Sequence, residues 1–232
     1  MISLAILGHA AVQTVRVSAP TMVDEYLGTS SVRVHNARLL SWGRAFCKRA
    51  ELRLDVAGRE NITDGESYIV MSNHQSHYDI PVLFDALSIP LRMVAKKELF
   101  DIPVMSHAMR YSGFVEIDRG NQRAAVQSIK EARAKLRSGL SLWIAPEGTR
   151  SEDGQLLPFK RGGFQLARMA KARILPVSLS GTRFVLRPGS GEVHRGVSVK
   201  VTIHPPVDPR SYKSKEVDQL VEQIKTTIAS GL

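Results

Sequence analysis

The sequence predicts an α/β fold in which a mixed, largely buried sheet is flanked by helices. Short apolar runs that suit buried strands recur along the chain, and stretches with helical periodicity separate them. Such alternation is typical of layered α/β domains. Hydrophobic residues make up 43% of the 232 residues and charged residues 23%, as in ordinary globular proteins, so one large domain or one domain with a small appendage is expected.

The first 50 residues predict a helical segment set apart from the α/β body. Within residues 31–50, Leu39, Trp42 and Phe46 recur at helical spacing, and basic residues decorate the rest of the helix. A helix of this pattern either lies on a membrane surface or packs on its own domain with a solvated polar face. We therefore expect residues 1–50 to form an amphipathic helical appendage and residues 51–232 to form the α/β domain.

The elements of the body follow from the two periodicities. Alternating or continuous apolar runs predict strands over residues 52–56, 68–71, 91–95, 114–117, 142–145, 174–179 and 197–203. Helical spacing predicts helices over residues 80–88, 97–111, 122–137, 162–172 and 215–229. Pro103 interrupts the second of these helices, and Ser214 is a suitable N-cap for the last one.

Charge and cysteine content narrow the classes of function. The formal net charge is +10, and residues 121–180 hold 11 basic against 4 acidic residues, which predicts an anionic partner such as a phosphorylated molecule, a lipid surface or a nucleic acid. The single Cys47 and the absence of zinc-like Cys/His spacing exclude a disulfide scaffold and a zinc finger. No run of about 18 apolar residues predicts a membrane-spanning helix, and the opening run lacks the basic start of a signal peptide.

The first candidate site is the segment Asn73-His74-Gln75-Ser76-His77-Tyr78-Asp79, directly after a predicted strand. Pro81 fits only the first turn of a helix, so the following helix is expected to begin near Asp79. The loop can then fold His74 back until one ring nitrogen meets the Asp79 carboxylate, which leaves the other nitrogen to take a proton from a hydroxyl. Alternatively, Asp79 is an N-cap and His74 a polar loop residue.

Three further segments could bind an anion. The segment from Pro146 to Ser151 follows another buried strand, and the forked side chain of Arg150 matches phosphate oxygens. Lys160 and its neighbours form a basic, glycine-rich start to a helix. Arg119 ends a predicted strand and could serve a phosphate or pair with an adjacent carboxylate. All these segments lie beside predicted strands, so they can converge at one side of a sheet, where α/β folds place ligands.

Together the segments resemble the 1-acyl-sn-glycerol-3-phosphate acyltransferases, or lysophosphatidic acid acyltransferases, of the glycerolipid acyltransferase superfamily. The family pattern N-H-x4-D matches Asn73, His74 and Asp79 in full. The block F-P-E-G-T-R-S matches residues 146–151 in full, with Ala145 in place of phenylalanine.

Two weaker blocks extend the resemblance over roughly residues 52–204. The block G-x-x-F-x-x-R matches at Gly113 and Arg119, with Glu116 in place of the aromatic residue, and a hydrophobic-proline block matches at residues 175–177. The two departures from the family pattern leave the charged positions intact, so they bear on the shape of the pocket more than on its chemistry.

The resemblance implies the glycerolipid acyltransferase fold and acyl transfer from a thioester to the sn-2 hydroxyl of 1-acyl-sn-glycerol-3-phosphate, giving phosphatidic acid in phospholipid biosynthesis. It assigns His74 as general base and Asp79 as its orienting partner. It implies an acceptor site of Arg119, Glu147, Gly148, Thr149 and Arg150, to which we add Lys160. No metal or cofactor is implied, because acyl-CoA or acyl carrier protein brings the thioester as a co-substrate. Ser76 and Ser151 could instead be nucleophiles, but the family precedent favours direct transfer.

Both substrates carry lipid tails, so we expect a peripheral enzyme on the cytoplasmic face of an anionic membrane. Trp42, Phe46 and the apolar N-terminus are the expected docking surface. One alternative keeps the chemistry and changes the acceptor to another lysolipid, such as lyso-ornithine lipid. A basic membrane-binding or nucleic-acid-binding protein is an alternative from a different class, although aromatic residues are only 6% of the chain and no RNA-recognition motif is present, so no nucleic acid partner is expected.

Overall fold

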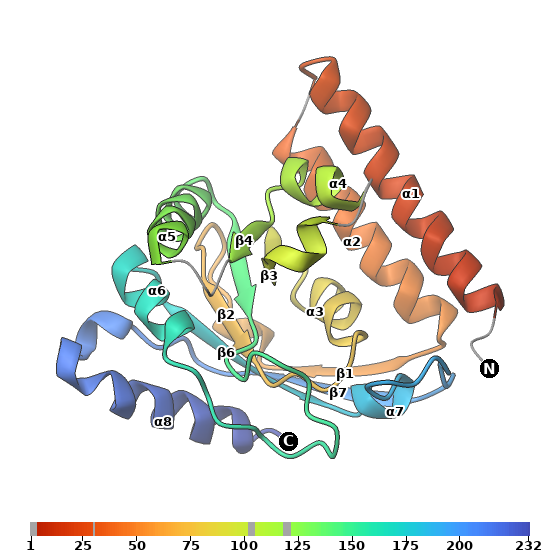
Figure 1. Cartoon of the computed structure of the whole chain (residues 1–232). Coiled ribbons are helices and arrows are strands. Elements are labelled where there is room, and N and C mark those ends of the chain that lie inside the picture. The colour runs from red at the N-terminus through yellow and green to blue at the C-terminus, as the bar shows by residue number, and fades with distance from the viewer. Residues whose placement is uncertain (1–3, 30, 102–104, 118–121) are drawn as a thin grey trace.

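The computed structural model describes residues 4–29, 31–101, 105–117 and 122–232, in which one seven-stranded sheet has the order β1-β7-β6-β2-β5-β3-β4 (Figure 1). The strands are β1 (Arg53–Ala57), β2 (Ile69–Ser72), β3 (Leu91–Lys96), β4 (Val115–Ile117), β5 (Ser141–Ile144), β6 (Ile174–Ser180) and β7 (Ser198–Ile203). The helices are α1 (Leu4–Tyr26), α2 (Val32–Arg49), α3 (Asp79–Leu87), α4 (Met105–Tyr111), α5 (Gln122–Arg137), α6 (Gly162–Ala170), α7 (Thr182–Val185) and α8 (Val217–Ala229).

The sheet is mixed, with β2, β5 and β6 at its centre. Neighbouring strands pair in parallel except β6 and β7, which pair antiparallel. Every residue of β2 and β5 is buried, and so is all of β6 except its last residue. Parallel strands covered on both faces are expected to be continuously apolar, and these segments are short apolar runs in the sequence. The predicted mixed and largely buried sheet is confirmed.

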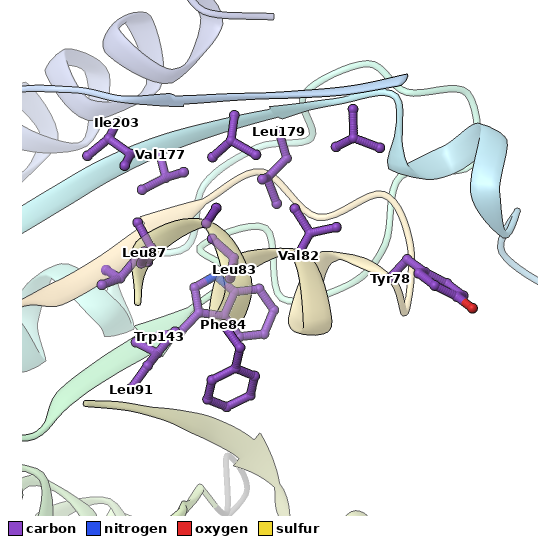
Figure 2. Packing of buried hydrophobic residues seen from close by; sticks show 14 of the residues in the cluster. Tyr78, Val82, Leu83, Phe84, Leu87, Leu91, Trp143, Val177, Leu179 and Ile203 are labelled. Carbon is purple, nitrogen blue, oxygen red and sulfur yellow. The ribbon is translucent and has the colours of Figure 1, made fainter. Parts of the chain in front are cut away.

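Helices cover the two faces of the sheet and divide the core in two. Figure 1 shows α5, α6 and α8 on one side of the strands, and α3, α2 and α1 successively farther out on the other. Val82 and Leu83 of α3 pack with Trp143 of β5 and Leu179 of β6 in one buried cluster (Figure 2). The second cluster, on the other face, joins β2, β5 and β6 to helices such as α6 and α8.

The aromatic stripe of α2 packs on α3. Trp42 lies against Phe84, with ring centroids 6.1 Å apart, and Phe46 lies against Tyr78 at 6.3 Å. Both rings are half-buried against the core cluster of this face. The expectation that this stripe docks on a membrane is therefore wrong, and the alternative that the helix packs on its own domain is correct. The cause is the apolar outer surface of α3, which α2 removes from water.

Helix α1 lies outside α2 and is joined to it by polar contacts. The Arg38 guanidinium of α2 forms an ion pair of 2.7 Å with Asp24 and donates to the Thr21 hydroxyl at 3.3 Å. None of the helices in the described ranges is both long enough and apolar enough to span a bilayer. Exposed valines on the outer side of α1, including Val12 and Val15, keep an apolar surface in contact with solvent.

Two segments differ from the sequence prediction. The expected helix over 97–111 is divided into a 3-10 helix at Lys97–Asp101 and the helix α4, and Pro103 lies outside the described residues. The short helix α7 was not predicted, because four residues are too few to display a period. It begins after Gly181, whose φ of 101° turns the chain sharply at the end of β6.

Close packing of α2 on α3 predicts the effect of an alanine at Gly43. A Cβ atom at this position would lie 2.7 Å from Cβ of Phe84 and 2.9 Å from the carbonyl oxygen of Pro81. We expect Gly43→Ala to lower the free energy of unfolding by about 1–3 kcal/mol, as overpacking does. The matched control Gly8→Ala in α1 has no atom within 4 Å and should gain about 0.5–1 kcal/mol from helix propensity. Urea unfolding of both variants measures the difference, and equal effects would contradict this packing.

Candidate active site

The loops that carry the sequence motifs leave the sheet at one edge. β5, β2 and β6 are parallel neighbours, so the segments that follow them begin at the same end of the strands. Residues 73–79 follow β2, residues 145–161 follow β5, and α7 follows β6. Ligands of α/β sheets bind at this carboxyl edge. The expected convergence of the first two motifs is confirmed, because backbone and side-chain hydrogen bonds join them directly.

Asn73 extends the pairing of β2 beyond the end of the strand. Its side-chain amide donates to the carbonyl oxygen of Leu179 at 2.8 Å, and its Oδ1 accepts from the Leu179 amide at 2.8 Å. The side chain thus takes the place of a backbone partner for β6 and is itself buried. This pair of bonds fixes the chain at the residue before His74. Asn73 was recognised from the sequence as part of a motif, but its clamping role was not.

His74 and Asp79 are in direct contact, as the spacing predicts. The His74 Nδ1 lies 2.6 Å from Oδ2 of Asp79. The same oxygen accepts from the amides of Gln75 at 2.7 Å and Ser76 at 2.9 Å, and Asp79 is fully buried at the first turn of α3. A carboxylate is favoured there because helix N-termini present unpaired N–H groups. With Nδ1 engaged, Nε2 is the ring nitrogen that remains for a substrate hydroxyl.

The segment after β5 holds the His74 backbone from both sides. The His74 amide donates to Oε1 of Glu147 at 2.8 Å, and its carbonyl oxygen accepts from the Ser151 amide at 2.8 Å. The second carboxylate oxygen of Glu147 accepts from the Leu157 amide at 3.0 Å. One buried carboxylate therefore links the histidine loop to two parts of the segment that follows β5.

Glu147 consequently differs from its expected role. The residue is 2% exposed and both of its oxygens are used by backbone amides, so its side chain points into the protein rather than toward a substrate. Burial raises the pKa of the Glu147 carboxyl, although the two amides and His74 oppose this shift. The sequence could not distinguish the two roles, because both place a glutamate in a turn after a strand.

The other predicted anion ligands of this segment face outward or line a turn. Gly148 has a φ of 74° and donates to the Ala145 carbonyl oxygen at 3.0 Å, which closes the turn. Thr149 is exposed and Arg150 is half-buried, and within the described ranges Arg150 forms no ion pair. Lys160 is exposed, and its backbone amide donates to the carbonyl oxygen of Pro146 at 2.8 Å. This bond holds the lysine-bearing segment beside the turn.

Arg119, the remaining predicted ligand, lies outside the described residues. The strand before it, β4, is at the edge of the sheet beside β3. Glu116 in this strand pairs with Arg110 of α4 at 2.7 Å. The acidic residue that stands where the family has an aromatic thus has a partner in a neighbouring helix.

The two serines considered as nucleophiles have other partners. The Ser76 hydroxyl is buried, donates to the Leu186 carbonyl oxygen at 2.7 Å and accepts from the Tyr78 amide at 3.1 Å. The Ser151 hydroxyl donates to a carboxylate oxygen of Asp153 at 3.0 Å and is buried too. These contacts connect α7 to the histidine loop and close the turn after Arg150. Both serines therefore serve the architecture of the site.

One aromatic side chain at the site was absent from the sequence prediction. The indole of Trp143 lies with its ring centroid 5.3 Å from that of His74, at an interplanar angle of 82°. The only signal in the sequence was a tryptophan within a short buried strand, which equally indicates ordinary core packing.

Comparison with known proteins agrees with this arrangement. The family model described as Acyltransferase matches residues 53–180, which is more than half of the chain. A chloroplastic 1-acyl-sn-glycerol-3-phosphate acyltransferase of Brassica napus is 34% identical over 181 residues, covering 78% of this chain and 51% of the relative. The enzyme of that name from Saccharomyces cerevisiae is 31% identical over 184 residues, covering 78% of this chain and 60% of the relative.

A solved structure extends the likeness to almost the whole chain. The 1-acyl-sn-glycerophosphate acyltransferase PlsC of Thermotoga maritima superposes with a TM-score of 0.84 at 29% sequence identity, covering 99% of this chain and 92% of that protein. By contrast, this chain spans only 51% and 49% of the length of the first two curated relatives.

The inward orientation of Glu147 predicts a loss of stability on a nearly isosteric change. Glu147→Gln replaces one carboxylate oxygen with an NH2 group, so one backbone amide faces another donor. We expect the free energy of unfolding, measured in urea, to fall by about 1–3 kcal/mol, the cost of an unsatisfied buried group. The matched control Glu152→Gln changes an exposed side chain in the same loop and should have no effect. A fully stable Glu147→Gln variant would restore the expectation that this carboxylate faces the substrate.

Proposed function

Because this chain belongs to the acyltransferase family, we propose that it transfers a fatty acyl group from an acyl thioester to the sn-2 hydroxyl of 1-acyl-sn-glycerol-3-phosphate, giving phosphatidic acid. The observation that carries the proposal is the contact of 2.6 Å between His74 and a fully buried Asp79 beside a basic turn. The curated relatives and the PlsC structure carry this activity in their names, and that likeness supports the choice of acceptor.

The proposed reaction uses His74 as general base. Its Nε2 takes the proton from the sn-2 hydroxyl as the oxygen attacks the thioester carbonyl carbon. The tetrahedral intermediate then expels the thiolate, which receives the proton back from the imidazolium. Asp79 holds the tautomer that carries hydrogen on Nδ1 and stabilises the imidazolium through the same hydrogen bond. The ester bond formed replaces the thioester bond broken, and no metal or further cofactor enters this scheme.

The acceptor phosphate is proposed to bind the outward residues of the turn after β5. Arg150 would form a charge-assisted contact, supported by the Thr149 hydroxyl, the Gly148 backbone and Lys160. Arg119 would complete the site from the segment after β4. Glu147 is left out of this set because its oxygens are occupied by backbone amides. Its contribution is to hold His74 beside the turn.

The donor is proposed to be acyl-CoA or acyl carrier protein loaded with a fatty acid. Either molecule presents the same thioester to His74, so the proposed chemistry is indifferent to the carrier. The excess of basic residues in residues 121–180 suits both, because each carrier is anionic. The assay described below separates them by supplying each donor in turn.

We place the protein peripherally on the cytoplasmic face of a membrane, with α1 as its docking helix. Val12, Val15 and Val23 follow one another at helical spacing and are each more than half exposed. A row of exposed apolar side chains on the outermost helix can enter the headgroup region without spanning the bilayer. This surface replaces Trp42 and Phe46, which are packed against α3.

Purified protein in detergent tests the reaction directly. With 1-acyl-sn-glycerol-3-phosphate and each donor, mass spectrometry should detect phosphatidic acid, and His74→Ala should lower the rate by about 10³-fold because the base is lost. The matched control His77→Ala changes the other histidine of the same loop and should retain most activity. If His74→Ala stays active, the assignment of the base is wrong. If another lysolipid, such as lyso-ornithine lipid, is acylated instead, the acceptor must be reassigned.

Sedimentation with anionic vesicles tests the docking helix. Val12→Ser combined with Val15→Ser should reduce the bound fraction at least severalfold, because burial of each valine contributes about 1.5 kcal/mol. Met169→Ser is the control, because Met169 is as exposed as these valines but lies on α6, on the other face of the sheet. Activity in detergent should be the same in all three proteins. Equal sedimentation of the double variant and the wild type would refute docking through α1.

A further inference from the structure

We propose that Trp143 is a positioning residue, which holds the His74 imidazole in its productive orientation through contacts that run by way of Ser72. The proposal rests on the function proposed above, because it concerns how the base of that reaction is oriented. Its basis is a ring contact, a short chain of hydrogen bonds and the register of two buried strands.

The hydrogen bond to Asp79 leaves one motion of His74 unconstrained. A contact at Nδ1 fixes that atom, but the ring can still rock about the line from its Cβ atom to the carboxylate, since such terminal torsions are broad. Rocking would swing Nε2 away from the acceptor hydroxyl. Trp143 is placed to prevent this, with ring centroids 5.3 Å apart and the planes at 82°. This edge-to-face arrangement is a preferred geometry for aromatic pairs.

The indole is itself held in place. Trp143 is 5% exposed, and its Nε1 donates to the Ser72 hydroxyl at 2.8 Å. That hydroxyl donates in turn to the carbonyl oxygen of Asn73 at 3.0 Å, and Asn73 is clamped to Leu179 of β6. The chain of bonds therefore runs from the indole to the peptide group that directly precedes His74. Asn73 therefore holds the backbone of His74 directly and the ring of His74 through Ser72 and Trp143.

The strand register explains why these residues meet. Trp143 of β5 is opposite Val70 of β2, and Ser72 lies two residues further along β2 on the same face. Side chains two residues apart on a strand point to the same side of the sheet. The indole can thus reach Ser72 and continue past it to the loop that begins at Asn73. The indole and Leu83 of α3 belong to the same buried cluster (Figure 2).

Ordinary core packing is the alternative explanation, because Trp143 belongs to the buried cluster on this face. A packing role predicts that replacements lower stability and leave the turnover of the folded enzyme unchanged. A positioning role predicts a fall in kcat with little change in KM, because substrate contacts are intact while the base is misplaced. The two roles therefore differ in a measurable way.

Steady-state kinetics with three variants form the first test. Trp143→Phe keeps a ring but loses the bond to Ser72, and we expect kcat to fall about tenfold with both KM values within about twofold. Trp143→Leu also loses the ring contact and should fall further, to about 1% of wild type. The matched control Phe84→Leu removes an equally buried ring that packs on Trp42, so kcat should stay within about twofold despite a lower melting temperature.

A double-mutant cycle tests the route through Ser72. Ser72→Ala removes the acceptor of the indole N–H and should lower kcat by itself. Combined with Trp143→Phe it should cost less than it does alone, because the phenyl ring has no N–H for Ser72 to accept and only the bond from Ser72 to the Asn73 carbonyl oxygen is then lost. Fully additive losses would show that the two residues act separately.

Fluorescence supplies a readout that does not depend on acyl transfer. In a Trp42→Phe protein Trp143 is the single tryptophan, and contact with an imidazolium quenches indole emission. Emission should fall as His74 is protonated, and the transition should vanish in Trp42→Phe/His74→Gln. Asp79, Glu147, His77 and Arg150 are ionisable groups that interact with this loop, Tyr78 lies within it, and this second protein retains all five.

The outcomes separate this inference from the proposed function. If the wild type forms phosphatidic acid but the emission is flat, or if Trp143→Phe and Trp143→Leu keep the kcat of Phe84→Leu, the positioning role is overturned alone. If no lysolipid is acylated while the emission follows His74, the contact stands and the proposed reaction is wrong. Should Trp143→Leu fail to fold, Trp143→Phe and the fluorescence titration still decide.

Discussion

A single carboxylate oxygen organises the candidate active site. Oδ2 of Asp79 accepts hydrogen bonds from the His74 ring nitrogen and from the backbone amides of Gln75 and Ser76. These three bonds to one atom fix the conformation of the loop before α3. This requires α3 to begin at Asp79, close to the end of β2. Packing of α2 through Gly43 holds α3 in that place from outside. The packing of α2 on α3 and the start of α3 near the end of β2 therefore together determine where the His74 imidazole lies.

Residues of the motifs divide by the direction in which they point. Asn73 and Glu147 turn inward and bind backbone groups, while Thr149, Arg150 and Lys160 are accessible to solvent at the same edge of the sheet. Rigid support beneath an accessible cationic turn is what acyl transfer to a phosphorylated acceptor requires, because the base must not move when the substrate binds. In the proposed reaction, each motif thus combines residues that would contact the acceptor with residues that hold the backbone beneath them.

The two N-terminal helices have different tasks, although both are amphipathic in the sequence. α2 uses its aromatic stripe to cover α3, whereas α1 leaves valines in solvent on the outermost layer. Whether the apolar stripe of a helix is buried or exposed depends on whether that helix packs against an apolar neighbour. Because burial of either stripe is worth a similar free energy per unit area, composition does not decide between them.

The sequence by itself determined the alternation of strands and helices, because periodicity is a local property. Spacing within one loop made the contact of His74 with Asp79 one of two interpretations, and the resemblance to the family favoured it. Only the tertiary structure decided that Glu147 faces inward, that Trp42 packs on α3, and that Trp143 reaches His74. Each of these depends on a partner more than 40 residues away, which is His74 for both Glu147 and Trp143 and Phe84 of α3 for Trp42. Contacts between distant segments form only when the sheet assembles, so the local sequence pattern does not specify which distant residue a given side chain contacts.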